Sequence, residues 1–538
     1  MTGRQNPLQA FFCATAEPLN VAVLRIVVFV CMASAIGRTD VVGLVRLPAG
    51  LRVPPPGYGP FFDWIPLEVR WATVTQALSF AACVTAVAGF MSRTSAAIAC
   101  ACATYVLGLP QMFGKVNHSD HHLIWFAAIL AATPSGDALS IDALRAAWRR
   151  ADRGDVAPPA SLAYALPLRF VWLLFGLIYF FPGLSKLRAG PRCFAGENIK
   201  RLMYENWQRR HFVPQFRIDR YPLLCGSLGL ATALFELSFL PCLFIPRLRL
   251  LIIAAGALFH VMTQTYLGIF FGRLVTCYVA FVDWSGVCRQ VGAQVFPQDF
   301  VLTYDPRDRG QRRLVASASA FDVLHRVRYA PDSTMEGGVR VSVGAHTLTD
   351  RHALLALLKR VPLLLPIVPL LRMRAGNPRS AAPAPASISS RGVASWSGTT
   401  ASIIVGSVLL AGNVYCGVAG IASWPFSIYP RFNEIVRPTR SFVEAVVRNP
   451  QSGARQVEIG LPTLVLERLV ADDPTRQAVR LRALKDWLVK GRVRLQPNET
   501  LQFFAITRST IPEEHDRPPL RRKLLSEFQA SEEGTSSD

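Results

Sequence analysis

The sequence is short of charged residues. Charged side chains make up 17% of its 538 residues, whereas 51% of the residues are hydrophobic. An average soluble domain has about 25% charged residues. With a mean hydropathy of +0.29, the composition excludes an ordinary soluble domain and predicts an integral membrane protein.

Acidic residues are scarcer than basic ones. The chain has 36 Asp and Glu against 58 Lys and Arg, which gives a formal net charge of +22. The basic residues lie mostly in loops between apolar stretches and in the C-terminal tail, as expected for a protein that contacts anionic lipid headgroups. Zinc-finger, helix-turn-helix and aromatic–basic stacking patterns are all missing, so we expect the lipid bilayer as a partner and no nucleic acid.

None of the eleven cysteines forms a CxxC pair. This excludes a zinc ribbon and a dithiol redox centre. Eight cysteines lie inside apolar runs, where they act as small hydrophobic residues: Cys31, Cys83, Cys100, Cys102, Cys225, Cys242, Cys277 and Cys416.

Long apolar stretches predict a polytopic, mainly α-helical membrane bundle of eight or nine spans. Each stretch approaches the roughly 20 residues that a membrane-crossing helix needs. The candidates are 18–37, 71–91, 95–113, 121–139, 164–187, 222–245, 249–268, 270–287 and 399–422. Only Arg273 separates the seventh and eighth, so a kinked pair or a re-entrant segment remains an alternative there.

The first span resembles a signal peptide at its end, where Ala33-Ser34-Ala35 could be cleaved. Arg25 interrupts the apolar run, and the preceding segment is long and weakly basic, so we expect an uncleaved span.

Short basic loops predict the orientation. With a cytoplasmic N-terminus they all fall on the cytoplasmic side: Arg93, then Arg145, Arg149, Arg150 and Arg153, then Arg247 and Arg249. The basic loop 188–220 would lie outside, but its length weakens the rule. The predicted location is therefore the cell membrane, crossed several times from a cytoplasmic N-terminus.

Outside the bundle we expect two small domains. Residues 299–373 predict an α/β domain with a strand at 300–304, a helix reaching Tyr329, a strand near 339–343 and helices from 348. A Pro-, Ala- and Ser-rich linker follows at 374–398, then the extra span at 399–422. Residues 424–525 predict an α+β domain with strands at 456–459 and 501–504 and an amphipathic helix at 476–488, and residues 526–538 a disordered tail.

Ionisable residues inside spans are costly and commonly functional. Arg25 and Glu236 are the deepest, and we predict that they form an ion pair that fixes helix packing, with a catalytic role as the alternative. Lys186 ends an apolar stretch: it either reaches to the headgroups or works as a base in a dry pocket.

Histidines add a second group of candidates. His118, His121 and His122 would share one helix face, as metal ligands do, but an interfacial cluster without metal is preferred. His260 is either a packing residue or a functional one. With a cytoplasmic N-terminus, His118, Lys186 and His260 all point toward the outer leaflet.

Four short motifs in the same order resemble the vitamin K-dependent gamma-glutamyl carboxylase and its bacterial relatives, the HTTM domain proteins. The resemblance covers roughly residues 15–290. Its motifs are Val116-Asn117-His118-Ser119, the phrase from Ala132-Thr133-Pro134 to Asp142, Tyr179 to Leu187 with Gly183 and Lys186, and Phe259-His260 with Gly268-Ile269-Phe270.

This resemblance implies chemistry with a reduced quinone, with carbon dioxide and oxygen as co-substrates. Lys186 would be the general base, with His118 and His260 as further catalytic residues. Asn117 would join His118 in hydrogen bonding near the oxyanion, and Tyr179 and His260 would form pocket walls. The second substrate would be a protein or peptide at the outer face.

Residues 299–373 resemble a different family, the DCC thiol-disulfide oxidoreductase-like domains. That family pairs an Asp with a CxxC, and here Asp308 and Gln311 occupy the positions of the two thiols. Without thiols there is no disulfide exchange, so we predict a degenerate thioredoxin-like domain with a structural or docking role.

Two other functional classes remain. A non-catalytic membrane scaffold, or a lipid- or partner-binding protein, is the alternative to an enzyme. A transporter would show inverted repeats, and we find no convincing internal repeat.

Overall fold

The computed structural model describes residues 6–58, 66–113, 116, 118–153, 159–335, 337–344, 346–367, 396–427, 435–461 and 463–529. The predicted linker 374–398 lies outside these residues except for 396–398. Asn117 also lies outside them.

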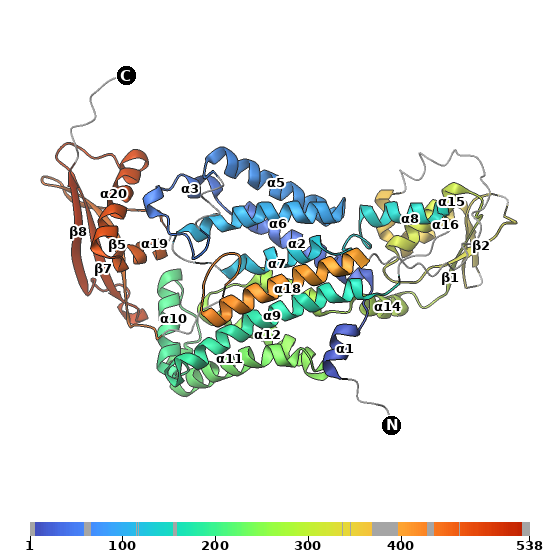
Figure 1. Ribbon diagram of the computed structural model, residues 1–538, viewed down its shortest axis with the longest axis horizontal. Helices are drawn as coiled ribbons and strands as arrows, with labels where there is room; N and C mark the ends of the chain where they lie inside the picture. The colour runs from blue at the N-terminus through green and yellow to red at the C-terminus, as the bar shows by residue number, and fades with distance from the viewer. Residues whose placement is uncertain are drawn as a thin grey trace, which may run out of the picture.

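A body of roughly parallel and antiparallel helices forms the middle of the molecule (Figure 1). Among the described residues, seven helices of this body are long and apolar enough to cross a membrane. They are α2 (Pro18–Gly37), α5 (Val69–Ala88), α6 (Ser92–Gly108, continued by the 3-10 helix η2, Leu109–Met112), α9 (Leu162–Ala189), α11 (Pro222–Cys242), α12 (Pro246–Leu267) and α18 (Trp396–Ala419). The mainly helical fold class is confirmed.

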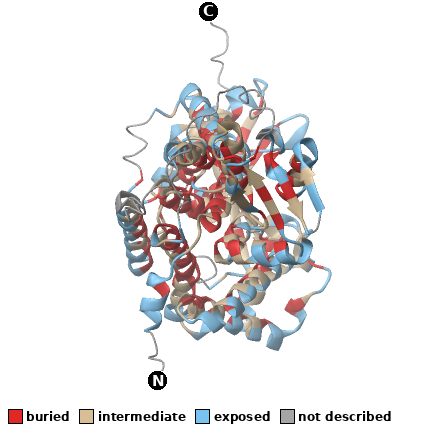
Figure 2. Ribbon diagram, turned by 90° about the vertical axis from the view of Figure 1, so that its right-hand side faces the viewer, coloured by how far each residue is buried: buried red, intermediate tan, exposed pale blue. Residues whose placement is uncertain are grey.

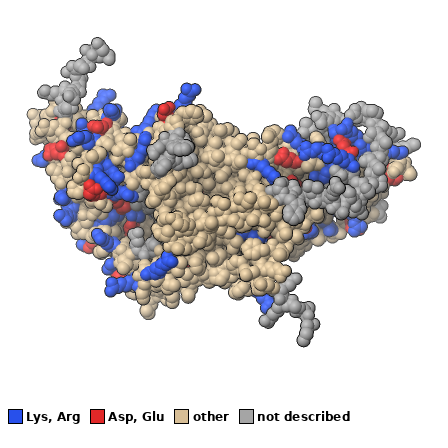
Figure 3. All heavy atoms as spheres, viewed as in Figure 1, with Lys and Arg blue, Asp and Glu red and all other residues tan. Residues whose placement is uncertain are grey.

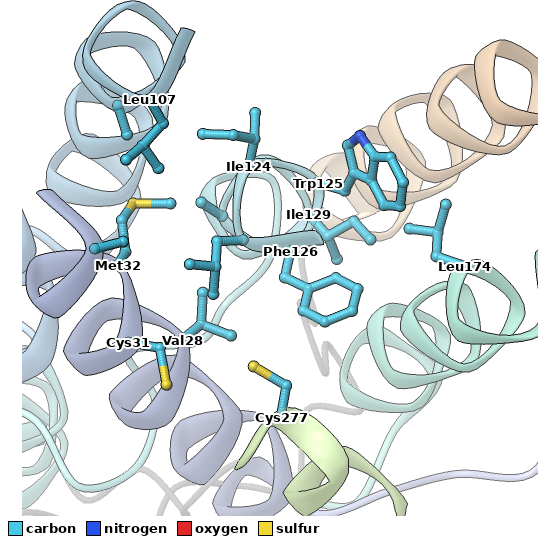
Figure 4. Close-up of a cluster of buried hydrophobic side chains, with 14 of the residues drawn as sticks. Val28, Cys31, Met32, Leu107, Ile124, Trp125, Phe126, Ile129, Leu174 and Cys277 are labelled. Atoms are coloured by element: carbon cyan, nitrogen blue, oxygen red, sulfur yellow. The ribbon is translucent and has the colours of Figure 1, made fainter. Parts of the chain in front are cut away.

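The predicted fourth span, 121–139, is wrong. Helix α7 (His121–Ala131) ends after eleven residues, before Pro134 and Gly136, and nine of its residues are buried. Figure 4 shows α7 surrounded by side chains of α2, α6 and α9, with Cys277 nearby. An apolar helix of this length is more typical of a buried core element than of a span.

The predicted eighth span, 270–287, is not one continuous helix, which leaves the alternative of a kinked or re-entrant segment. Gly268 ends α12 with a φ of +61°, and the chain continues as α13 (Gly272–Thr276), the 3-10 helix η6 (Cys277–Phe281) and α14 (Trp284–Val295). The apolar run is thus divided into short pieces, one of which, η6, packs against α2.

Buried residues gather in the interior, and much of the periphery is exposed (Figure 2). The exposed side chains include large apolar ones on α5, α11, α12 and α18, for example Leu78, Leu234, Leu258 and Val408. Figure 3 shows charged side chains gathered over the two ends of the molecule and few over the helices between them. An apolar belt between two charged ends is the surface that a bilayer-spanning protein requires.

One end carries a four-stranded sheet of order β2-β1-β3-β4. Its strands are β1 (Phe300–Tyr304), β2 (Arg328–Pro331), β3 (Arg340–Val343) and β4 (His346–Thr349). Strand β1 pairs parallel with β2 and antiparallel with β3. Helices α15 (Arg309–Phe321) and α16 (Asp350–Arg360) accompany the sheet. The strand predicted at 300–304 is confirmed, whereas Tyr329 lies in a strand rather than at a helix end.

This domain is attached to the helical body through α8 (Ile141–Arg153). Asp152 of α8 forms ion pairs with Arg309 at 3.1 Å and Arg313 at 3.2 Å. Trp148 donates a hydrogen bond from its indole nitrogen to the Ser317 hydroxyl at 2.8 Å. Polar contacts therefore fix the domain against the end of the body where the predicted cytoplasmic arginines lie.

The other end carries an antiparallel sheet of order β6-β5-β7-β8. It consists of β5 (Thr439–Asn449), β6 (Gly453–Val457), β7 (Thr500–Ser509) and β8 (Arg521–Gln529), with α19 (Thr463–Ala471) and α20 (Pro474–Gly491). The predicted disordered tail begins too early, because residues 526–529 pair with β7. Helix α18 joins the two ends of the molecule (Figure 1).

Shorter elements complete the chain. Helix α10 (Gly196–Arg210) packs against α11 and α12 at the β5–β8 end. The remaining elements are α1 (Pro7–Cys13), α3 (Val41–Val45), η1 (Ala49–Leu51), η3 (His118–Asp120), η4 (Pro191–Cys193), η5 (Ile218–Arg220), η7 (Pro362–Ile367) and η8 (Pro512–Glu514).

Candidate functional site

Helix α9 supplies the centre of the site. Tyr179 and Lys186 are seven residues apart, about two helical turns, so they lie on one face of α9. Gly183 lies on the same face, one turn before Lys186. A Cβ atom at Gly183 would be 2.9 Å from the Cβ of Glu236 and 3.1 Å from the backbone nitrogen of Leu237. Only glycine therefore allows α9 and α11 to approach this closely.

Lys186 and Glu236 form a buried ion pair across this contact. The Lys186 Nζ lies 2.5 Å from both Oε1 and Oε2 of Glu236. Both residues are 4% exposed. Two opposite charges held together in a dry interior stabilise each other, whereas either alone would be strongly unfavourable there.

The predicted ion pair between Arg25 and Glu236 is wrong. The Arg25 guanidinium instead donates hydrogen bonds to the carbonyl oxygens of Ser135 at 2.5 Å, Ala138 at 3.3 Å and Leu139 at 2.6 Å. A guanidinium carries five N–H donors, which suits a loop of several carbonyls better than one carboxylate. Arg25 thus fixes the loop between α7 and α8, and Glu236 is left for Lys186.

Tyr179 and His260 come together, as a shared pocket would require. The Tyr179 hydroxyl is hydrogen-bonded to His260 Nε2 at 2.6 Å and to the Tyr278 hydroxyl at 2.5 Å. A Cβ at Gly256 would lie 2.5 Å from the Tyr278 hydroxyl. Gly256 on α12 therefore makes room for Tyr278, the third member of the hydrogen-bonded chain formed with Tyr179 and His260.

Tyr278 was not among the site residues predicted from the sequence. It lies in the stretch that we read as an apolar span, where a single hydroxyl attracts no attention. The available signal was chemical: a buried tyrosine hydroxyl needs a hydrogen-bond partner, and Tyr179 and His260 were already candidates.

His118 lies in η3, close to other polar groups. Its ring centre is 5.3 Å from that of His121, whose Nε2 contacts the Ser423 carbonyl oxygen at 3.1 Å. Asp120, in the same turn, forms an ion pair with Arg273 of α13 at 2.6 Å.

Phe271, just before α13, has its ring 5.2 Å from that of His260. Asp120 of η3 and His260 of α12 therefore both contact residues in or next to α13. A direct role for His118 beside Lys186 stays a prediction. Within the part of the chain that the structure describes, no three His, Cys, Asp or Glu residues are grouped as metal ligands.

A cavity of about 110 Å³ opens beside Lys186. Its walls come from η4, α10, η5, α11 and α12 and are mainly apolar. They include Phe194, Ile199, Leu202, Met203, Ile218, Leu228, Gly229, Phe259, Met262, Thr263, Tyr266 and Leu267. The Lys186 side chain therefore does not extend to the headgroups; it borders an apolar chamber.

Phe259 separates this cavity from the hydroxyl chain. Its ring centre is 6.4 Å from that of Tyr179 and 5.2 Å from that of Phe235. The site thus has two polar centres on one face of α9, the Lys186–Glu236 pair and the Tyr179–His260–Tyr278 chain, with an aromatic wall between them.

The apolar belt, the seven long helices and the buried polar centres define a helical membrane protein with an internal site. Residues 14–283 match the family model described as HTTM domain. The chain belongs to this family, which is associated with vitamin K-dependent carboxylase-like membrane proteins. No curated protein and no solved structure matches the chain.

Proposed function

We propose that the protein is a membrane enzyme that takes up a reduced quinone in the cavity beside Lys186 and uses its oxidation for carboxylation or a coupled oxidation of a second substrate. The observation that carries this proposal is the Lys186–Glu236 pair, buried and open to an apolar chamber. Membership of the HTTM family supports it.

The residues around the cavity fit such a ligand. A reduced quinone would supply an acidic ring hydroxyl and two electrons, with oxygen and carbon dioxide as co-substrates. The aromatic and aliphatic walls suit its ring, since apolar surfaces drive binding from water or lipid into a shaped pocket. Lys186 is the only charged residue among the described residues that line the cavity, and Glu236 is its ion-pair partner.

The pair acts as the base in this proposal. With Nζ at 2.5 Å from both carboxylate oxygens, a proton can move from the amine to Glu236 and leave a neutral amine as the acceptor. That amine then takes the proton of a ligand hydroxyl, and the resulting ammonium faces the ligand oxyanion, so neither charge is isolated in the interior. Glu236 is therefore a partner in proton transfer that sequence reasoning assigned to packing.

We assign the Tyr179–His260–Tyr278 chain to positioning Phe259, the cavity wall that the rings of Tyr179 and His260 contact. Its members are fixed by two short hydrogen bonds, so its polar atoms are held in place before a ligand binds. His118 and Asn117 keep the proposed role near the oxyanion, and the Asp120–Arg273 ion pair supports it by holding η3 near His260.

The domain of β1–β4 is proposed as a degenerate thioredoxin-like module. Asp308, at one thiol position, caps α15 by accepting hydrogen bonds from the backbone nitrogens of Gly310 and Gln311. Gln311, at the other, accepts from the Asp305 nitrogen at 2.8 Å and donates to the Gly337 carbonyl at 2.9 Å. The side chains at both thiol positions thus stabilise the loop by hydrogen bonds and cannot carry out thiol chemistry. This favours a docking role for the domain.

The substitution Lys186→Arg tests whether Lys186 acts as the general base. In Lys186→Arg the positive charge opposite Glu236 is kept, but a guanidinium stays protonated at neutral pH. We expect a folded protein whose rate of quinol oxidation falls by about 100-fold or more, the contribution typical of a general base. The measurement is quinol oxidation by the purified protein in detergent, with the product identified by mass spectrometry.

Lys200→Arg is the matched control, because Lys200 lies on α10 with its amine 3.9 Å from Glu197 and outside the cavity. It should oxidise quinol at the wild-type rate. A Lys186→Arg protein that also does so would refute the base and favour a non-catalytic scaffold.

A further inference from the structure

Two arginines converge on one indole ring at the end of the helical body opposite Lys186. Arg169 lies near the start of α9 and Arg249 near the start of α12. Their guanidinium carbons are 4.0 Å and 4.6 Å from the centre of the Trp172 ring. The same carbons are 5.2 Å and 5.9 Å from the ring of Phe11, which belongs to α1.

Within the described part of the chain, no carboxylate compensates the positive charge of Arg169 and Arg249. Arg169 donates from Nε to the Phe11 carbonyl, and Arg249 from Nε to the Leu243 carbonyl, both at 3.0 Å. No ion pair joins either arginine to a carboxylate among the residues that the structure describes. The terminal nitrogens of both guanidiniums therefore remain as donors for an anion, and their mutual repulsion favours one.

The surroundings of Arg169 and Arg249 are apolar and exposed, as a lipid-binding surface requires. Helix α1 lies beside the end of the body (Figure 1) and exposes Leu8 (53%). On α12, Leu250 and Leu251 next to Arg249 are 75% and 67% exposed. Cations thus stand at the edge of the apolar belt, at the level where phospholipid headgroups meet acyl chains.

We propose that Arg169 and Arg249 bind the phosphate of an anionic phospholipid at the predicted cytoplasmic leaflet. Guanidinium groups match phosphate oxygens with paired N–H donors, and basic pockets between membrane helices on the cytoplasmic side are suited to such headgroups. Trp172 and Phe11 hold the two side chains in place, and the exposed leucines receive the acyl chains. A free phosphate would use the donors but not the leucines.

The test compares bound lipids by native mass spectrometry after incubation with phosphatidylglycerol and phosphatidylcholine in equal amounts. Wild type should retain phosphatidylglycerol preferentially. In the Arg169→Gln, Arg249→Gln double variant, loss of two charge-assisted contacts should lower that preference about tenfold or more. Arg247→Gln, on the same helix and exposed, removes a charge of the same kind and should leave the preference unchanged.

Two results would overturn the proposal. One is an Arg247→Gln variant that loses the preference as fully as the double variant, which would indicate a general electrostatic attraction. The other is displacement of the lipid by millimolar inorganic phosphate, which would indicate a free-anion site. If the double variant does not fold, the Arg169→Lys, Arg249→Lys variant decides: it keeps charge but loses the paired donors, and an undiminished preference contradicts the proposal.

Discussion

At the scale of residues, the buried cations Arg25 and Lys186 are stabilised in different ways. Arg25 is surrounded by three loop carbonyls, and Lys186 is matched by one carboxylate. In the first arrangement the terminal nitrogens of the guanidinium hold a loop in place. The second leaves a single exchangeable proton beside a cavity, and this difference separates a structural cation from a candidate catalytic one.

The stability of Lys186 and Glu236 variants should show how strongly the two buried charges depend on each other. Glu236→Leu alone leaves a buried ammonium without its partner and should lower the free energy of unfolding by about 3–5 kcal/mol. Combining it with Lys186→Met removes both charges, and the double variant should be close to wild type in stability. Thermal unfolding in detergent measures both.

The double variant also separates stability from activity, because it should be stable yet inactive toward quinol. A double variant as unstable as Glu236→Leu alone would contradict the view that the two charges stabilise mainly each other.

At the scale of elements, α9 organises the site. Glycines at two positions on one face let α11 approach, since a Cβ at Gly176 would meet Leu240 at 2.5 Å and one at Gly183 would meet Glu236 at 2.9 Å. Tyr179 lies between these glycines and Lys186 follows them. The spacing of small residues along α9 therefore sets the geometry of both polar centres.

Gly183→Ala should disturb this contact. The added Cβ would overlap with the Glu236 side chain and the Leu237 backbone, so α9 and α11 must separate, at a cost of about 1–3 kcal/mol typical of overpacking. Gly37→Ala in α2 is the matched control, because a Cβ there meets nothing within 4 Å. Unfolding midpoints that fall equally for both variants would argue against a close contact at Gly183.

Long, regular helices and strands could be predicted from the sequence, but the elements that pack against them could not. The first span at 18–37 and the strand at 300–304 have the expected bounds. Helix α7 was overextended because its apolar character reflects burial by neighbouring helices, which a single-chain pattern cannot distinguish from contact with lipid.

Among the site residues, Lys186, Tyr179 and His260 were identified from the motifs. Glu236 was identified as buried but was given the wrong partner, because sequence shows which charges are deep and not which helix faces which. Tyr278 could be assigned to the site once the structure showed its hydroxyl bonded to that of Tyr179.

At the scale of the whole molecule, the β5–β8 domain is held beside the cavity by α10 and η5. Arg217 donates hydrogen bonds to Asp219 at 2.7 Å and to Glu513 at 2.8 Å, and Gln208 donates to the Ser509 carbonyl at 2.9 Å. Met203 and Ile218 of these same elements line the cavity. Movement of this domain would therefore be transmitted to the wall of the site.

Acid should loosen this docking. Burial opposes ionisation of Asp219 and Glu513, but hydrogen bonds outweigh it and hold the pKa of both carboxyls below their usual range. The main ones come from Arg217 to Asp219, and from its own backbone nitrogen and then Arg217 to Glu513. Groups with lowered pKa values stabilise the folded state above their ordinary pKa, and this stabilisation is lost as the pH falls below about 4.

Limited proteolysis between pH 7 and pH 3 should show release of the domain at the acid end. Arg217→Gln should release it already at neutral pH, whereas Arg220→Gln, an exposed neighbour, should not. Identical cleavage of both variants at neutral pH would contradict the proposed contact.

Labelling by a photoreactive quinone tests the central claim most directly. In wild type the label should attach to residues that line the cavity, such as Met203 or Met262. Gly229→Leu fills the cavity wall, where a Cβ already meets Ile199 at 3.0 Å, whereas a Cβ at Gly226 meets only the Gly196 nitrogen at 3.8 Å. The account predicts that Gly229→Leu abolishes the label and that Gly226→Leu keeps it; labelling elsewhere, or equal labelling of both variants, would contradict it.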